Sequence, residues 1–292
     1  METIADRRVY FGEFAGPLAH GSAIFDWQLI STQELVAAFD HPFAAILADD
    51  GIPYAPVVVD ATVHRYPAIG DVITVDTTPV AVGESSLDLR YEVTDGDGQP
   101  IATVTATHVT IASDGTALSL PNAVREGYAD ACVTDGNSGP QRTPDTPATA
   151  DDTDTAVTAE SASHPSYETT VPIRSPHIEG AELAYFEEYP RFAGDALEAF
   201  VAKQGTSTGA LSDEKQPYKL RSWQWEFKAP VRFESNLHVD CEVVAVDSDV
   251  IRVAHEFSSD GTTNIEGVTE YGCFDSAGEP TTFDESMLDP FR

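Results

Sequence analysis

A loop interrupted by glycine and proline places one carboxylate, Glu13, and one imidazole, His20, just before a hydrophobic segment. Residues 7–11 are expected to form a short strand before this loop, and Ser22 stands where a helix N-cap would stand. The following residues 23–30 are apolar on nearly every side, which is typical of a buried helix. A carboxylate aimed at the start of such a helix predicts a hydrolytic site. The backbone N–H groups that would form its oxyanion site belong to Gly21, Ser22 and Ala23.

For each of the two ionisable loop residues, a structural role is the alternative to a catalytic role. Glu13 is the candidate nucleophile or general base, and a solvated surface carboxylate is the alternative. His20 could orient a water molecule or polarise a carbonyl, and a hydrogen bond at the start of the helix is the alternative. His64 and His108 lie in strand-like segments, where we interpret them as core or sheet-face residues.

The composition is strongly acidic, with 49 acidic and 16 basic residues among 292 and a formal net charge of −33. The acidic residues are spread through every segment, which indicates a heavily solvated surface whose self-repulsion concentrated salt would screen. We therefore interpret the chain as a cytoplasmic protein of a halophilic archaeon. Phosphate contacts to nucleic acids require lysine and arginine, so this balance argues against a nucleic-acid partner.

Cysteine usage and hydropathy argue against metals, disulfides and membranes. Cys132, Cys241 and Cys273 have no metal-site spacing and form no paired framework, which fits a reducing cytosol. The first residues lack the apolar stretch of a signal peptide, and no apolar run approaches the roughly 20 residues of a membrane span. No metal and no other cofactor is expected.

The remaining chain predicts a sheet wrapped on the buried helix. The helical pattern continues to about residue 39 and must end before Pro42, and residues 43–52 are expected to form a loop. Strand-like segments joined by glycine-containing turns then fill residues 56–111. Residues 130–166 are rich in proline, threonine, alanine and aspartate, which predicts a disordered linker.

The segment after this linker repeats the pattern of the first. Residues 191–201 carry a helical apolar stripe, with a break or kink expected at Pro190, and strand-like segments follow. An offset of 163 residues superposes Pro67 on Pro230, together with two turns and several strand residues. The sequence therefore predicts a tandem duplication.

Two motifs of the first half follow those of one known family. Residues 12–22 have the spacing of a Gly-Asp-x-Asp-x-x-Gly loop and the helix start behind it, with Glu13 on the catalytic aspartate. Residues 63–72 are similar to a strand that ends in a Pro-Ala-x-x-Gly-Asp corner, and residues 227–234 match it again. In these motifs the chain resembles hotdog-fold proteins, in particular the 4-hydroxybenzoyl-CoA thioesterase-like group of acyl-CoA thioesterases.

The resemblance covers residues 7–125 and 167–290. It implies an α+β fold of two tandem hotdog domains, each an antiparallel sheet around a long central helix. The expected domains are residues 1–129 and 167–292, which would form a pseudo-dimer within one chain and could assemble further. Under the offset Glu13 falls on Pro176, so one active site is expected, between the first loop and the second helix.

The resemblance implies hydrolysis of an acyl-CoA thioester to free acid and CoA. The catalytic residues would be Glu13 and His20, with the thioester oxygen held at residues 21–23. A cluster of basic residues could bind the CoA phosphates, or could instead neutralise nearby carboxylates. The candidates are Arg65, Lys219, Arg221 and Lys228.

Several positions depart from the family pattern and leave two other functions open. The first aspartate of the loop motif is not acidic here, and the Asn-Tyr at the helix start is Ser22-Ala23. These departures favour a non-catalytic acyl-CoA-binding paralogue as one alternative. A hotdog-type enoyl-CoA hydratase or dehydratase is the other, because residues 192–195 resemble a fragment of the hydratase motif.

Overall fold

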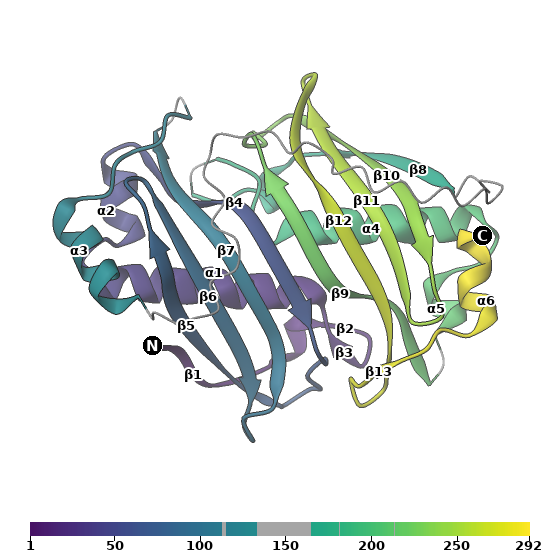
Figure 1. The fold of residues 1–292 in the computed structure, drawn as a ribbon. Helices are drawn as coiled ribbons and strands as arrows, with labels where there is room; N and C mark the ends of the chain where they lie inside the picture. The colour runs from purple at the N-terminus through teal and green to yellow at the C-terminus, as the bar shows by residue number, and fades with distance from the viewer. Residues whose placement is uncertain (113–114, 133–164, 181, 213) are drawn as a thin grey trace, which may run out of the picture.

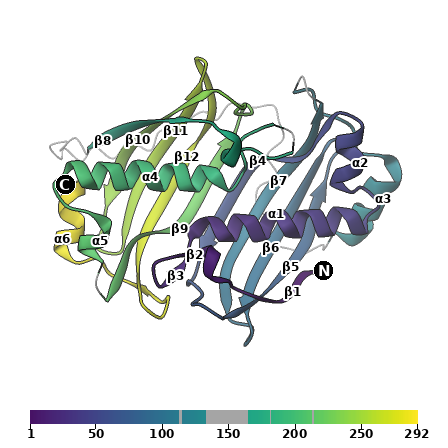
Figure 2. The same cartoon turned by 180° about the vertical axis from the view of Figure 1, so that it is seen from behind.

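The computed structural model describes residues 1–112, 115–132, 165–180, 182–212 and 214–292. They form an 11-stranded sheet in the order β1-β5-β6-β7-β4-β9-β12-β11-β10-β8, with β13 beside β12 (Figure 1). Two long helices, α1 and α4, lie along one face of this sheet, one in each half of the molecule (Figure 2). The predicted α+β class, with an antiparallel sheet around a long helix in each half, is confirmed.

The first half, residues 1–132, builds its sheet around α1. In chain order its elements are β1 (Glu2–Arg8), the 3-10 helix η1 (Phe11–Glu13), β2 (Phe14–Ala15), β3 (Leu18–Ala19), α1 (Gly21–Ala38), α2 (Phe43–Ala48), β4 (Gly51–Val63), β5 (Val72–Val82), β6 (Ser86–Asp95), β7 (Pro100–Ala112) and α3 (Asn122–Ala131).

The second half, residues 165–292, repeats this order around α4. Its elements are β8 (Ser166–Pro172), the 3-10 helix η2 (Ser175–His177), α4 (Glu188–Lys203), α5 (Thr208–Leu211), β9 (Lys215–Phe227), β10 (Asn236–Val246), β11 (Val250–Ser259), β12 (Thr262–Asp275), β13 (Pro280–Thr281), α6 (Glu285–Leu288) and the 3-10 helix η3 (Asp289–Phe291). The linker predicted for residues 130–166 falls largely outside the described residues.

The two halves are joined through their central strands. β4 pairs antiparallel with β9, so the sheet is continuous across the junction. Tyr66 crosses the junction, because its hydroxyl donates to the carbonyl oxygen of Leu220 at 2.7 Å and its N–H donates to that of Gly278 at 2.9 Å. Gly278 has φ +85°, and a Cβ there would collide with the carbonyl oxygen of Tyr66. Glycine is therefore required at this contact between the two halves.

Backbone hydrogen bonds establish which residues of the two halves correspond. The N–H of His20 donates to the carbonyl of Glu13 at 2.7 Å, and Tyr185 donates to His177 in the same way at 2.8 Å. One turn later, the N–H of Ala23 bonds the carbonyl of His20 at 3.0 Å, and Glu188 bonds Tyr185 at 3.0 Å. Tyr185 thus takes the place of His20, and His177 takes the place of Glu13. The predicted tandem repeat is confirmed.

Several local predictions were wrong for identifiable reasons. The N-cap of α1 is His20 rather than Ser22, because the imidazole accepts the capping hydrogen bond. Residues 43–48 of the expected loop form α2. α4 passes Pro190 without a break, because proline is tolerated in the first turn of a helix. The expected strand at residues 7–11 lies earlier, as β1. In the described part of the chain, no helix is long and apolar enough to span a membrane.

Candidate functional site

The N-terminal ends of the two central helices meet in the middle of the molecule. Figure 2 shows α1 and α4 starting near the centre and running to opposite ends. Two related contacts join them: Arg191 Nε donates to Ser22 Oγ at 3.0 Å, and the carboxyl of Asp26 lies against that of Glu187. Glu187 corresponds to Ser22, and Arg191 corresponds to Asp26. We call the two contacts the Ser22 corner and the Glu187 corner.

At the Ser22 corner the expected oxyanion donors are mostly engaged. His20 Nδ1 accepts from the backbone N–H of Ser22 at 3.1 Å and lies 2.7 Å from its hydroxyl oxygen. The N–H of Ala23 donates to the carbonyl of His20. Of the three expected donors, only Gly21 N–H has no acceptor among the described residues.

Positive charge surrounds this corner. Burial lowers the pKa of His20 to about 4, and the charges of Lys219 and Arg191 act in the same direction. The imidazole is therefore neutral near neutral pH. Lys219 Nζ donates to the carbonyl oxygen of Ala15 at 2.9 Å, and burial lowers the pKa of this ammonium to about 8.

The Glu187 corner holds two carboxyls in place of a hydroxyl and a guanidinium. Burial raises the pKa of Asp26 above its usual range. Burial and the negative charge of Asp26 raise the pKa of Glu187 to about 7. Glu187 Oε2 is buried and has no donor among the described residues when both groups are ionised. A single proton shared by the pair supplies that donor, since two carboxylates in contact cannot both ionise cheaply.

The first turn of α4 adds unbonded backbone donors to this corner. The N–H of Glu188 donates to the carbonyl of Tyr185 at 3.0 Å, but no side chain caps the helix. No acceptor for the N–H groups of Phe186 and Glu187 exists in the part of the chain that the structure describes. Free N–H groups at a helix N-terminus stabilise developing negative charge. An acid–base pair beside such donors is suited to acyl transfer.

Glu13 belongs to the Glu187 corner, but its carboxylate is fully engaged. Oε1 accepts from Arg7 at 2.6 Å and from Trp27 Nε1 at 2.7 Å, and Oε2 accepts from the N–H of Tyr10 at 2.7 Å. These bonds close η1 and fix the second turn of α1, which carries Asp26. His177 closes η2 in the same manner, through a 3.2 Å hydrogen bond from the N–H of Arg174.

The basic residues expected to bind phosphate do not gather at one place. Arg221 forms an ion pair with Asp249 at 2.9 Å, and Lys219 lies at the Ser22 corner. Arg65 is paired with Asp95, and Lys228 is paired with Glu266. Three of these four cations thus bind carboxylates of their own surroundings.

Asp26 and Glu187 were not identified as candidate site residues from the sequence, although the position of Asp26 could have indicated such a role. Asp26 is the one charged residue in the apolar run 23–30, four residues after Ser22 and therefore on the same helix face. The position of Glu187 gave no such indication, because its role depends on a contact between distant segments. Within the described residues, no cluster of three or more His, Cys, Asp or Glu side chains could hold a metal ion.

Two family models match the chain, one in each half. A model of the thioesterase-like superfamily matches residues 177–291, and a model of the acyl-ACP thioesterase N-terminal domain matches residues 54–126. No curated protein sequence matches the chain.

Solved structures share the whole double fold at low sequence identity. A protein described as an oleoyl thioesterase from Lactobacillus plantarum is 12% identical, with a TM-score of 0.69 over 95% of this chain and 96% of that chain. The 12:0-ACP thioesterase from Umbellularia californica is 13% identical, with a TM-score of 0.65 over 95% and 96%. An acyl-ACP thioesterase from Bacteroides thetaiotaomicron is 12% identical, with a TM-score of 0.63 over 92% and 96%. Together with the two family matches, this architecture identifies the chain as a tandem double-hotdog member of the hotdog-fold thioesterase superfamily.

Proposed function

We propose that the protein hydrolyses an acyl thioester at the Glu187 corner. The observation that carries the proposal is the proton-sharing pair of Asp26 and Glu187 beside the unbonded N–H groups that open α4. Superfamily membership supports thioester chemistry. The Ser22 corner offers fewer free donors and no carboxyl pair, so it is the weaker site.

In this proposal the pair supplies both a base and an acid. The thioester carbonyl oxygen accepts hydrogen bonds from the N–H groups of Phe186 and Glu187. Ionised Asp26 takes a proton from water as its oxygen attacks the carbonyl carbon, and the N–H groups stabilise the resulting oxyanion. The carbon–sulfur bond then breaks, and the thiolate takes the proton of Glu187. Transfer of the proton from Asp26 to Glu187 restores the starting state.

Glu13 acts in this proposal as a positioning residue. It binds Arg7 and Trp27, and both the guanidinium of Arg7 and the carboxylate of Glu13 act electrostatically on Asp26. The catalytic carboxyls are thus Asp26 and Glu187 rather than Glu13. His20, first considered as a catalytic residue, caps α1 at the other corner.

The proposal also specifies the carrier to which the acyl group is attached. An acyl-CoA substrate was expected from the sequence, whereas two of the similar structures are described as acyl-ACP thioesterases. The ion-paired state of Arg65, Arg221 and Lys228 supports recognition of the acyl group and the shared pantetheine arm rather than of the CoA phosphates. We therefore propose a carrier-bound acyl thioester, with acyl-ACP preferred to acyl-CoA.

Thiol release from acyl-ACP and acyl-CoA of matched chain length tests the proposal. We expect Asp26→Asn and Glu187→Gln each to lower kcat by about 100-fold or more, as for other acid–base residues. Ser22→Ala, at the corresponding position of the other corner, should stay within about threefold of the wild type. Loss in Ser22→Ala with activity kept in Asp26→Asn would move the site to the Ser22 corner. Binding without thiol release would instead indicate a non-catalytic acyl-binding protein.

A further inference from the structure

A phenylalanine precedes each carboxyl of the Glu187 corner in the sequence, and the two phenyl rings are in contact. They are Phe25, before Asp26, and Phe186, before Glu187. Their ring centroids are 5.4 Å apart and their planes lie at 89°, which is an edge-to-face contact. Phe25 is completely buried, whereas Phe186 is half-buried. Aromatic carbon therefore lies on the interior side of the carboxyl pair.

Trp223 on β9 packs against both of these rings from the sheet. Its ring centroid lies 4.4 Å from that of Phe25 and 5.7 Å from that of Phe186. The indole is completely buried, and Trp225 on the same strand contacts it with a centroid distance of 4.3 Å. We call the rings of Phe25, Phe186 and Trp223 the aromatic block. Protein interiors are close-packed, so rings in such contact fill the space between them.

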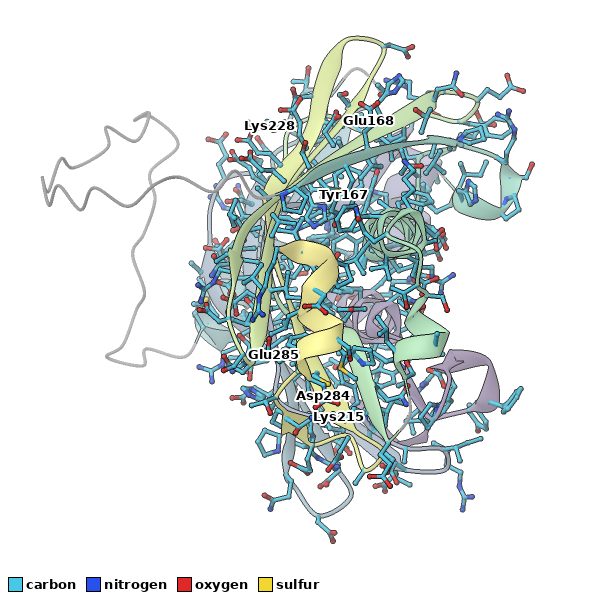
Figure 3. All side chains as sticks on the ribbon, turned by 90° about the vertical axis from the view of Figure 1, so that its right-hand side faces the viewer. Tyr167, Glu168, Lys215, Lys228, Asp284 and Glu285 are labelled. Atoms are coloured by element: carbon cyan, nitrogen blue, oxygen red, sulfur yellow. The ribbon has the colours of Figure 1, made fainter. Side chains whose placement is uncertain are left out.

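The packed layer continues beyond the aromatic block, across β9, β12 and β11. The ring centroids of Trp225 and His255 are 5.4 Å apart, and those of His255 and Tyr271 are 6.3 Å apart. The first half buries a tyrosine–histidine pair on its equivalent strands, with Tyr91 on β6 and His108 on β7, also 6.3 Å apart. Figure 3, which views the molecule from the end of the second half, shows side chains filling the layer between sheet and helices. A displaced ring of the block would therefore have to move into other buried side chains.

β4, the strand of the first half that corresponds to β9, carries smaller side chains. Both strands have 13 residues. The residues directly after them, His64 and Lys228, donate their N–H groups to Ile101 and Asn264 at 2.8 and 2.7 Å, respectively. Counting back from these two residues aligns the buried side chains of the strands. The aligned pairs are Val59 with Trp223, Ala61 with Trp225 and Val63 with Phe227.

The Ser22 corner has no equivalent of the aromatic block. By the helix correspondence established above, Phe186 takes the place of Gly21, and Pro190 takes the place of Phe25. With Val59 in place of the tryptophan, none of the three equivalent positions carries an aromatic ring. The block is thus no requirement of the duplicated fold. It belongs to the corner that holds the carboxyl pair.

The position of the block limits where an acyl chain can go. In the proposed reaction the N–H groups of Phe186 and Glu187 bond the thioester oxygen, so the acyl chain starts beside the ring of Phe186. A chain directed inward meets Phe25 and Trp223 after its first few carbon atoms, and overpacking a filled interior is unfavourable. A chain directed outward stays in water and forgoes about fourfold in affinity for each CH₂ group. In either direction, added CH₂ groups bring no gain.

We propose that the aromatic block limits the length of the acyl group, with Phe186 as the specificity-determining residue. The proposal rests on the proposed thioester hydrolysis and names its substrate class, thioesters of short-chain acyl groups. Phe186 is the outermost ring, because it is half-buried while Phe25 and Trp223 have no exposed surface. Its two parts have separate roles, since the backbone N–H bonds the oxyanion and the ring ends the acyl site.

Binding of free acids of increasing length tests this proposal without requiring hydrolysis. Calorimetry with hexanoate, octanoate and decanoate measures the affinity gained for each added CH₂ group. We expect the affinity of the wild type to rise by less than about threefold from hexanoate to decanoate. Phe186→Ala keeps the backbone N–H and opens the block, so its affinity should rise by about tenfold or more, since each buried CH₂ group contributes about fourfold.

Phe43→Ala is the matched control, because Phe43 is also half-buried and stacks on Tyr54, with ring centroids 6.0 Å apart, at the far end of α1. It should bind the three acids as the wild type does. Phe186→Leu, a smaller change that keeps more of the interior filled, guards against loss of folding and should show an intermediate rise. A wild-type affinity that keeps rising to decanoate would overturn the proposal. So would the same small rise in Phe186→Ala, or no binding of any acid by either protein.

Thiol release from hexanoyl and decanoyl pantetheine, measured in parallel, separates the two proposals. Hydrolysis by a wild type whose affinity for acids keeps rising with length refutes only the chain-length limit. A limit that Phe186→Ala removes, without thiol release by the wild type, refutes only the thioesterase function.

Discussion

The two halves share a backbone frame but use it in opposite ways. Both close a 3-10 helix before the central helix, and both bury a tyrosine–histidine pair with centroids 6.3 Å apart. In the first half, α1 bonds its pair through Thr32. In the second half, α4 offers alanine and leucine, and polar atoms remain unpaired. The duplicated backbone thus stays constant, while the hydrogen bonding of the tyrosine–histidine pair differs between the halves.

The two contacts between the N-terminal ends of α1 and α4 also differ, in this case in the charge of the paired side chains. One corner pairs Ser22 with Arg191, where a hydroxyl oxygen accepts from a guanidinium. The other places Asp26 against Glu187, where burial and like charge raise the pKa of Glu187 to about 7. The contact of the Ser22 hydroxyl with the Arg191 guanidinium stabilises the junction, whereas the contact of the two carboxyls holds a proton that the proposed reaction uses. Substitutions that change a residue of one half and leave the corresponding residue of the other half intact test this comparison.

The largest expected effect is on the pH profile of thiol release. The proposed reaction needs Asp26 ionised and Glu187 protonated, so kcat/KM should be bell-shaped, falling at low pH and again above about 7. Burial acts first on both groups, and the charges of Arg7, Arg191, Glu13 and Glu188 modify them. Glu187→Gln should lower the maximum by about 100-fold or more and abolish the alkaline limb.

Ser22→Ala is the control for this profile, since it alters the corresponding residue and should retain both limbs. An unchanged alkaline limb in Glu187→Gln would show that another group supplies the acid.

The second effect is on stability, and it compares the two buried tyrosines. Tyr91→Phe leaves His108 Nε2 without its partner, so it should cost about 1–3 kcal/mol. Tyr271→Phe removes an unpartnered hydroxyl and should change stability by less than about 0.5 kcal/mol. Thermal unfolding midpoints in one buffer measure both. Equal losses would show that Tyr271 is bonded in solution, which would remove the contrast between the halves.

The helix and the sheet of each half could be predicted from the sequence, because they depend on local residue patterns. The apolar run behind residue 22, the alternating strands and the repeat predict a helix wrapped by a sheet in each half. The loop around Glu13 does precede the central helix, but its carboxylate bonds Trp27 in the second turn of α1, whereas the sequence led us to expect it at the start of the helix.

The choice between the two corners could not be predicted, because it rests on contacts between helices far apart in the sequence. Burial raises the pKa of Asp26, and Asp26 meets Glu187 only across the junction of the halves. The cluster of basic residues misled for a related reason. Side chains alternate between the faces of a strand, so Arg221 and Lys228 on and near β9 meet separate carboxylates, Asp249 and Glu266.

A smaller effect links the carboxyl pair to stability. Because the pKa of Glu187 is raised to about 7, the folded protein holds this proton more strongly than the unfolded chain does. Its contribution to stability is therefore complete below the ordinary glutamate pKa and is lost as the pH rises through about 7. Glu187→Gln should stabilise the protein by about 1 kcal/mol near pH 8, a modest value because solvent screens this half-buried pair.

The same variant should match the wild type in stability near about pH 2, well below the ordinary pKa of aspartate and glutamate, where both carboxyls are protonated in either state. Ser22→Ala should show no such dependence on pH. A constant difference between Glu187→Gln and the wild type across this range would mean that the two carboxyls do not share a proton.

The smallest effect compares the outer faces of the two sheets. A row of directly paired residues crosses each half, and in the second half every member is acidic. That row is Glu168, Asp240, Glu256, Glu266 and Glu226. The corresponding row of the first half is Glu2, Asp76, Glu92, Thr103 and Thr62. Like charges directly opposite each other destabilise a sheet, so the second row should make folding more dependent on salt.

Glu256→Gln and Glu92→Gln form the matched pair for this row. Glu256 faces Asp240 and Glu266, so its neutralisation should stabilise the protein by about 0.5 kcal/mol at low ionic strength. Glu92 faces one acid and binds Arg90 at 2.7 Å, so its neutralisation should bring no gain. The gain at Glu256 should vanish in molar salt, where the Debye length is roughly 3 Å. Because only the charge changes, a gain that persists in molar salt would assign the effect to packing rather than to the row of carboxylates.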